Sequence, residues 1–194
     1  MCKYNQLYIW VEGKRDKKFF ERVVKSGFER IYGRGRVHIR QYRPKKDKEV
    51  VGLIKNFKAV GNDCIGVTDI NSAPCVTKRK EEKQKEEFVN VDKDSIMIVV
   101  KEIESWYLAG LDKSACQKLG VAEFENTEMI TKHKFDSLLR RSKISNFRID
   151  SEQEILKHFD IETAKQKNES FRYFAEKFVR KYGLQSIGNV DNNT

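Results

Sequence analysis

The chain has 194 residues, 35% of them charged, and carries a formal net charge of +10. This length allows one domain with a core of its own and room for a small appendage. The apolar runs are only a few residues long, against the ~20 residues of a membrane-spanning helix, so no membrane partner is expected. The four cysteines form no C-x-x-C pair, which excludes the common zinc motifs, and an N-terminus without an apolar leader indicates a cytoplasmic protein.

The surplus of basic residues favours a polyanionic partner, because every phosphate that a lysine or arginine neutralises releases counterions. A basic charge also serves solubility, so charge by itself leaves other partners open. Nucleic acid becomes the favoured partner only when the charge is taken together with the carboxylates described below.

The first half of the chain alternates strand and helix patterns, which predicts a parallel α/β sheet flanked by helices. Four short apolar runs are the predicted strands, at residues 6–11, 36–42, 64–68 and 95–100. The helix after the first strand is expected to end at Gly27, and the helix after the second strand to end before Gly61. The second strand carries basic residues on one face, which predicts an edge position or a solvent-facing surface. The charged run 78–87 is predicted to be a solvated helix or loop.

After about residue 122 only helical patterns follow, around residues 129–139, 152–159 and 168–182. The aromatic side chains of the last segment form one stripe, which predicts packing on the main domain rather than a base-stacking surface. We therefore expect an α/β domain of residues 1–121, a helical extension of residues 122–187 packed on it, and a flexible tail of residues 188–194.

Three of the predicted strands lead into acidic residues, namely Glu12, Asp69 and the pair Glu102 and Glu104. Because the carboxyl ends of parallel strands meet at one edge of the sheet, these side chains are expected to form one site. Oxygen-rich sites suit Mg²⁺ or Mn²⁺, which can polarise a phosphoryl oxygen and generate hydroxide. Glu104 is favoured over Glu102 because it fits just inside a helix N-terminus, where the helix dipole favours a carboxylate.

Two further residues could add oxygen ligands to this site. Asp16 falls one helical turn after Glu12, and Asn71 lies two residues after Asp69 as a neutral donor. Taken singly, Glu12 is better explained as a helix N-terminal charge, Asp16 as a first-turn acid and Asp69 as an N-cap. Strand ends of α/β proteins also often carry aspartate as a turn residue. The interpretation as a metal site therefore depends on the coincidence of three strand ends.

Several motifs resemble a known fold family. The segment V-E-G-K-R-D at residues 11–16, between a predicted strand and a predicted helix, resembles the first motif of the Toprim fold. The segment T-D-I-N at residues 68–71 is similar to the Toprim D-x-D motif, with Asn71 in place of the second aspartate. K-E-I-E-S-W-Y-L-A-G at residues 101–110 resembles the E-x-E-x-W-x-L-A-D element of small stand-alone Toprim-like proteins of the OLD-nuclease type. N-E-S-F-R-Y-F at residues 168–174 is similar to a C-terminal segment of the same proteins.

This resemblance implies a four-stranded Toprim (Rossmann-like) domain with a metal-dependent phosphoryl-transfer site. It implies catalytic roles for Glu12, Asp69 and Glu104. Asp16 matches a second acid of the first motif, whereas Asn71 departs from the family pattern and leaves open one bound ion instead of two, or an inactive relative.

The resemblance also bears on the partners. The chain is too short for a topoisomerase or a full primase. It lacks the G-x-x-x-x-G-K-[ST] loop, so an ATPase of the kind that accompanies OLD nucleases would be a separate chain. A role in a bacterial or archaeal defence system is implied by the resemblance alone.

Basic residues near these motifs are the candidate nucleic-acid contacts. Lys14 and Arg15, beside Glu12, are expected to hold the scissile phosphate. Each of the other candidates is equally well explained as a solvated surface charge. They lie on the second strand, in the loop after it, or in a second cluster, and they are Arg36, Arg40, Arg43, Lys45, Lys46, Arg140 and Arg141.

The favoured hypothesis is a Toprim-type nuclease that uses Mg²⁺ or Mn²⁺ to hydrolyse a phosphodiester of DNA or RNA. The alternative is a non-catalytic subunit that binds nucleic acid or a partner protein through a degenerate site. An RNA-processing Toprim ribonuclease would share the chemistry and differ in its substrate. The sequence does not distinguish DNA from RNA or a monomer from a homo-oligomer.

Overall fold

The computed structural model describes residues 6–43, 45–146 and 150–182, and the chain divides into two compact units. The first unit ends at Val100 and the second begins at Lys101. The division therefore falls earlier than the boundary expected after residue 121. The reason is that the helix following the sheet packs with the C-terminal helices, as described below. The expected tail of residues 188–194 lies outside the described residues.

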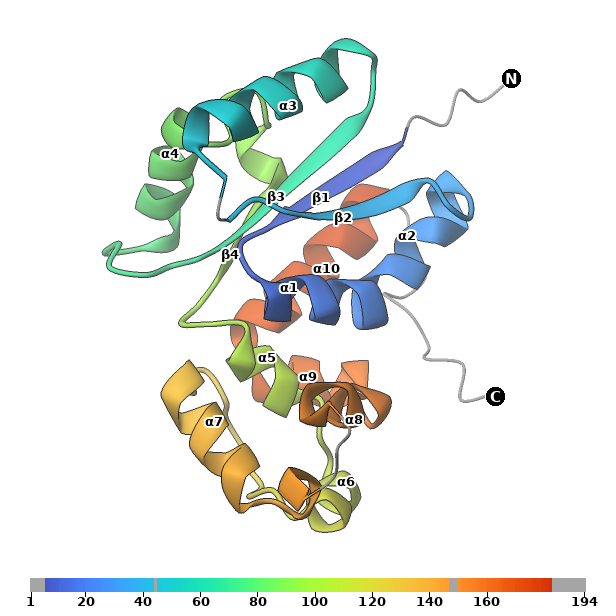
Figure 1. Ribbon diagram of the computed structural model, residues 1–194, viewed down its shortest axis with the longest axis vertical. Helices are drawn as coiled ribbons and strands as arrows, with labels where there is room; N and C mark the ends of the chain where they lie inside the picture. The colour runs from blue at the N-terminus through green and yellow to red at the C-terminus, as the bar shows by residue number, and fades with distance from the viewer. Residues whose placement is uncertain (1–5, 44, 147–149, 183–194) are drawn as a thin grey trace. The chain divides into compact units, whose positions relative to one another are not determined.

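The first unit is built on a four-stranded sheet in which all strands are parallel, as predicted. The strands are β1 (Leu7–Val11), β2 (Val37–Gln41), β3 (Asp63–Asp69) and β4 (Ile96–Val99). Their order across the sheet is β2-β1-β3-β4 (Figure 1). The basic strand β2 thus lies at an edge, which confirms the expectation from its charged face. All five residues of the central strand β1 are buried, as expected for a parallel strand covered on both faces.

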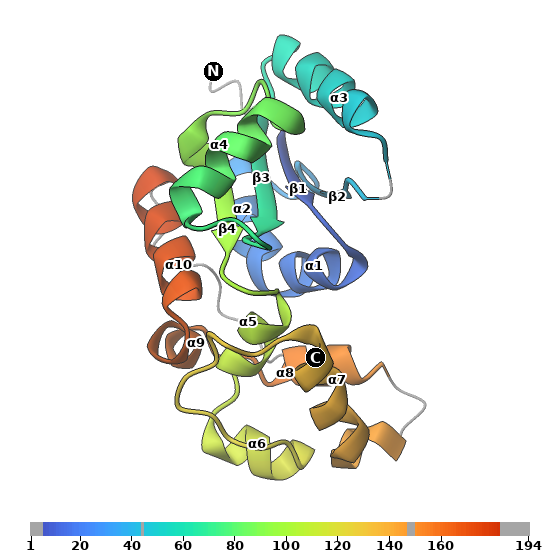
Figure 2. The same cartoon turned by 90° about the vertical axis from the view of Figure 1, so that its left-hand side faces the viewer.

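Helices cover the two faces of this sheet. One face packs with α3 (Asp47–Ala59) and α4 (Val76–Glu86) through a core that contains Tyr8 and Trp10 of β1. The helices α1 and α2 lie on the opposite face (Figure 1, Figure 2). A short 3₁₀ turn, Lys93–Ser95, leads into β4.

The helical segment after β1 is longer than predicted. It comprises α1 (Lys14–Phe19), a π-helical turn (Phe20–Val24) and α2 (Lys25–Tyr32). The π turn inserts wider i→i+5 spacing without stopping the helix. The predicted end at Gly27 is therefore wrong, and Gly27 is buried inside α2. The helix ends instead at Gly33, whose φ of +94° is accessible mainly to glycine.

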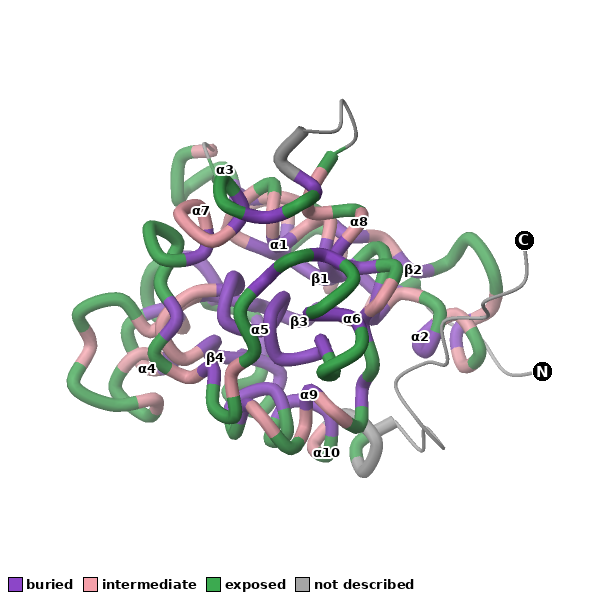
Figure 3. Tube along the Cα trace, turned by 90° about the horizontal axis from the view of Figure 1, so that it is seen from below, coloured by how far each residue is buried: buried purple, intermediate pink, exposed green. Residues whose placement is uncertain are grey.

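The second unit is helical in its described part. It contains α5 (Glu104–Ala109), α6 (Lys113–Leu119), α7 (Lys132–Arg141), a 3₁₀ turn (Lys143–Asn146), α8 (Ser151–Lys157), α9 (Ile161–Lys167) and α10 (Glu169–Tyr182). Every residue of α5 is buried, and Figure 3 shows this helix in the buried colour. None of the helices in the described ranges is long and apolar enough to cross a membrane.

The core of the second unit explains the tryptophan motif and the C-terminal aromatic motif. The Trp106 indole N–H donates to Ser170 Oγ at 2.8 Å, and the Trp106 ring meets the Phe171 ring edge-on at 5.2 Å. Phe174 lies 5.1 Å from the same indole. The predicted aromatic stripe therefore packs on α5 as an ordinary core. The remainder of the stripe, beginning at Phe178, has side chains outside the described residues.

Candidate functional site at the carboxyl end of the sheet

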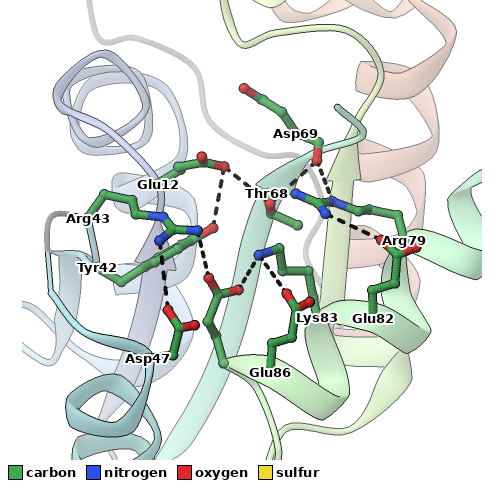
Figure 4. A network of polar contacts seen from close by, with 11 residues as sticks. Glu12, Tyr42, Arg43, Asp47, Thr68, Asp69, Arg79, Glu82, Lys83 and Glu86 are labelled. Atoms are coloured by element: carbon green, nitrogen blue, oxygen red, sulfur yellow. Dashed lines mark hydrogen bonds and ion pairs between the residues drawn. The ribbon is translucent and has the colours of Figure 1, made fainter. Parts of the chain in front are cut away.

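Glu12 occupies the turn between the end of β1 and the start of α1. Its carboxylate accepts hydrogen bonds from two hydroxyl groups, one in β3 and one on the residue that directly follows β2. Thr68 Oγ1 lies 3.2 Å from Glu12 Oε2, and the Tyr42 hydroxyl lies 3.5 Å from the same oxygen (Figure 4). The side chain is only half-buried, so its carboxylate is held in place at the carboxyl end of the sheet while part of it faces solvent.

Tyr42 alternates with the exposed arginines Arg36 and Arg40 along the second strand, but its side chain is not exposed as theirs are. Its ring is buried, it belongs to the core on the α3 and α4 face, and its backbone N–H donates to Val11 O at 2.9 Å. Burial, and next the negative charge of Glu12, raise the pKa of Tyr42 well above its ordinary value. The phenol therefore remains protonated at neutral pH and acts as a hydrogen-bond donor to Glu12.

Asp69 is the last residue of β3, the strand that pairs directly with β1. Its backbone carbonyl accepts a hydrogen bond from Arg79 Nε at 2.9 Å. In Figure 4 the side chains of Glu12 and Asp69 extend from adjacent strand ends on either side of Thr68. The structure thus brings these two predicted carboxylates to the same edge of the sheet.

Asp16 has a structural role that accounts for part of its carboxylate. Its Oδ2 accepts from the Gly13 backbone N–H at 3.0 Å, which caps the start of α1. A Cβ at Gly13 would lie 3.1 Å from that oxygen, so this close approach favours glycine. Asp16 is thus accounted for as a first-turn acid that caps α1, and this structural role competes with the metal role expected from the sequence.

Asn71 lies in the turn after β3 and is exposed. Its φ is +48°, in the left-handed region that asparagine adopts more readily than most residues. This backbone conformation gives a physical reason for an asparagine at the position of the second motif aspartate. The turn explanation therefore competes with the ligand role that the motif implies.

Glu102 and Glu104 both belong to the second unit, which begins at Lys101. Glu104 is buried in the first turn of α5, where the helix dipole favours a carboxylate, as predicted. Glu102 Oε2 accepts a hydrogen bond from the Lys132 backbone N–H at the start of α7. Glu102 therefore joins two helical segments of its own unit.

The carboxylates of the first unit suit one hard cation. Across the described ranges, no three or more His, Cys, Asp or Glu side chains are grouped so as to hold a metal ion. Mg²⁺, however, is commonly held by one or two carboxylates, with water and substrate phosphate completing its coordination. Glu12 and Asp69 fit that smaller ligand set, whereas a centre of three clustered carboxylates is not seen within the first unit.

The predicted basic contacts separate into different locations. Arg36 precedes β2 and its carbonyl accepts from Leu7 N, so it lies at the amino end of the sheet. At ~3.3 Å per strand residue, Arg36 lies ~16 Å along β2 from Gln41. Arg36 is therefore at the end of the sheet opposite to Glu12. Arg40 is exposed near the carboxyl end of the same strand.

The remaining basic candidates lie at the ends of helices or in the loop before α3. Lys14 and Arg15 begin α1, directly after Glu12 and Gly13. In the loop before α3, Lys46 is exposed and Lys45 pairs with Glu49 at 2.7 Å. Arg140 and Arg141, both exposed, end α7 in the second unit.

The second unit also contains a cavity of about 350 Å³. Its lining is formed by residues of α6, the 3₁₀ turn and α8, which are Lys118, Leu119, Lys143, Ile144, Ser151, Glu154 and Lys157. Two of the three lysines already have partners, because Lys143 Nζ donates to Gln117 O and Lys157 Nζ to Glu154. The lining thus combines two apolar side chains, Leu119 and Ile144, with three lysines.

Sequence reasoning missed a buried ionic network beside Glu12. The prediction that the charged run 78–87 is solvated is wrong for one face of α4, where Lys83 is buried. Lys83 Nζ lies 2.5 Å from Glu87 Oε2, and Arg43 Nη2 donates to Glu87 Oε1 at 3.0 Å. The available signal was the i, i+4 spacing of a lysine and a glutamate directly before an apolar residue, Phe88.

Comparison of the chain with protein-family models, with curated proteins and with solved structures gives no match. The likeness to Toprim proteins therefore depends on the motifs alone.

Proposed function

We propose that the protein is a metal-dependent phosphodiester hydrolase that acts on DNA or RNA. The observation that supports this most is the pair of carboxylates, Glu12 and Asp69, at the ends of adjacent parallel strands. Sites of α/β proteins form at this edge of the sheet. Basic residues follow or flank the same edge, as a polyanionic substrate requires.

In this proposal each residue has a defined task. Glu12 and Asp69 would hold Mg²⁺ or Mn²⁺, which when bound supplies Lewis-acid activation of a phosphoryl oxygen. Thr68 and Tyr42 donate to Glu12 Oε2 and orient its carboxylate. Lys14, which starts α1 two residues after Glu12, would attract the substrate phosphate.

A cleavage assay tests the proposal. Plasmid DNA, single-stranded DNA and total tRNA are incubated with the protein in Mg²⁺, Mn²⁺ or EDTA. Glu12→Gln and Asp69→Asn are expected to lose cleavage, because each removes a charged ligand while preserving size. Glu21→Gln, an exposed glutamate in the same unit, is the matched control and should cleave like the wild type. Cleavage in EDTA, or by Glu12→Gln, would refute the assignment.

Glu104 is tested separately, because the motif resemblance alone gives it a catalytic role. If that role holds, Glu104→Gln loses cleavage at an unchanged melting temperature. A variant that melts lower and still cleaves at permissive temperature would assign Glu104 to the core of the second unit instead.

A second candidate function has its own support. Asn71 replaces an acid in the motif, and its left-handed turn explains why an asparagine is there. A non-catalytic subunit that binds nucleic acid or a partner ATPase would have this weakened ligand set. It predicts binding of DNA or RNA that is unaffected by EDTA, with no cleavage of any substrate.

A further inference from the structure

We propose that Arg43 forms a phosphate-binding subsite beside Glu12 and that the buried Glu87 positions it. This inference rests on the proposed function, since it names the side chain that seats a backbone phosphate of the nucleic acid. It separates Arg43 from the other basic residues of the loop and edge strand.

The first support is the location of Arg43. Its backbone N–H donates to Glu12 O at 3.3 Å, so the two residues are joined at the carboxyl end of neighbouring strands. Its guanidinium carbon lies 5.9 Å from the centre of the Tyr42 ring, whose hydroxyl contacts the Glu12 carboxylate.

The second support is the fixed orientation of the guanidinium. Glu87, with a side chain only 1% exposed, accepts from Arg43 Nη2 at 3.0 Å. The Arg43 side chain itself remains 46% exposed. Nη2 of the group is thus anchored by a buried carboxylate, while nearly half of the Arg43 side chain remains exposed. A planar guanidinium has five N–H donors that suit a phosphate.

The third support is the charge balance inside the network. The buried carboxylate of Glu87 is shared by two cations, because Lys83 Nζ lies 2.5 Å from its other oxygen. Asp47 lies 3.7 Å from Arg43 Nη1, but both side chains are about half exposed, and such surface pairs contribute little. An arriving phosphate would therefore complement Arg43 without displacing a strong partner.

A buried ionic network is costly to desolvate, and an apolar substitute of similar volume is often at least as stable. Its presence on one face of α4 is explained if it holds Arg43 in place. By this account Lys83 and Glu87 are positioning residues, since neither is placed against the substrate itself.

The test is a binding experiment in EDTA, which requires no cleavage. Fluorescence anisotropy measures the affinity of a labelled single-stranded DNA, and of an RNA of the same sequence, over a range of salt concentrations. Arg43→Gln should weaken binding about 10-fold, the loss expected for one charge-assisted hydrogen-bonded contact, and reduce the salt slope by about 1. Arg43→Lys should recover part of the loss.

Arg36→Gln is the matched control, because it makes the same change at an exposed arginine at the amino end of β2. It should weaken binding less than about 3-fold, well short of one lost phosphate contact. Glu87→Gln should weaken binding like Arg43→Gln at a temperature where it is folded, and a methylphosphonate DNA should be insensitive to Arg43.

Three results would overturn the subsite. The first is an equal loss of binding affinity in Arg43→Gln and Arg36→Gln. The second is an unchanged affinity in folded Glu87→Gln, and the third is a wild type that binds neither the DNA nor the RNA. Failure of the hydrolase proposal gives a different result. If nucleic-acid binding depends on Arg43 but no substrate is cleaved, the hydrolase proposal is refuted and the phosphate-binding subsite is supported.

Discussion

Thr68 Oγ1 lies 3.2 Å from Glu12 Oε2, so a hydroxyl near the end of β3 donates to the carboxylate that follows β1. Thr68 is fully buried, whereas Glu12 is half-buried. The core of the sheet therefore holds a carboxylate that still reaches solvent, an arrangement suited to a site that must keep its geometry when substrate arrives.

The first prediction concerns this hydrogen bond. Thr68→Val keeps the side-chain shape and removes the donor, so cleavage should fall about 10-fold because a hydrogen bond to a charged group is lost. Initial cleavage rates measure the effect. Thr77→Val, on the exposed surface of α4, should leave the rate unchanged. Equal rates for the two variants would show that Thr68 does not support the site.

The second prediction is a pH dependence of stability. Burial, and secondly the Glu12 carboxylate, raise the pKa of Tyr42 above its ordinary value of 10.0. The unfolded tyrosine ionises near pH 10 while the folded one stays protonated, so its stabilising contribution is complete below that pH and declines above it. Urea unfolding should therefore show an additional loss of ~1.4 kcal/mol per pH unit above about pH 10 in the wild type.

Tyr42→Phe should lack this additional alkaline loss. Tyr173→Phe removes the hydroxyl from a half-exposed tyrosine of α10 and should follow the wild type. Parallel pH profiles for wild type and Tyr42→Phe would contradict the raised pKa.

The third prediction concerns the contact between β3 and the chain after α4. A Cβ at Gly66 would lie 2.7 Å from the Phe88 ring, which is fully buried. Gly66→Ala should therefore lower the free energy of unfolding by ~1–3 kcal/mol through overpacking. Gly52→Ala makes the same change in α3, where nothing lies within 4 Å of the added carbon, and should stabilise by ~0.5–1 kcal/mol. Urea denaturation measures the change in the free energy of unfolding of each variant. A change in the same direction for both variants would contradict the close contact between Gly66 and Phe88.

The fourth prediction tests whether the ionic network on α4 is buried as described. Lys83→Met leaves Glu87 buried with Arg43 alone and should destabilise by ~3 kcal/mol. Lys78→Met, on the exposed face of the same helix, should change stability by less than ~0.5 kcal/mol. Melting and urea unfolding distinguish the two, and a tolerated Lys83→Met would show that this pair is not the buried contact described here.

The parallel sheet and its edge strand were predictable because apolar periodicity and charge report directly on burial. The position of Glu12 and Asp69 at the same edge of the sheet was also predictable, because the carboxyl ends of parallel strands lie at one edge. The prediction that the helix ends at Gly27 was wrong because a π turn lets the helix continue to Gly33. Single-residue signals do not reveal such a turn.

Tertiary contacts account for what the sequence did not reveal. Tyr42 follows a strand whose other alternate residues are basic, and only packing against α3 and α4 buries it. The burial of Lys83 depends on Glu87 and Arg43, which lie 44 residues apart in the chain. Local patterns carry no information on such distant pairings, so a charged run was predicted to be solvated.

The most direct test of the central claim is a Mn²⁺ titration followed by electron paramagnetic resonance, without substrate. The wild type is predicted to bind one Mn²⁺ that Glu12→Gln and Asp69→Asn both lose and that Glu21→Gln retains. Equal Mn²⁺ binding by the wild type and Glu12→Gln would contradict a metal site at the carboxyl ends of β1 and β3.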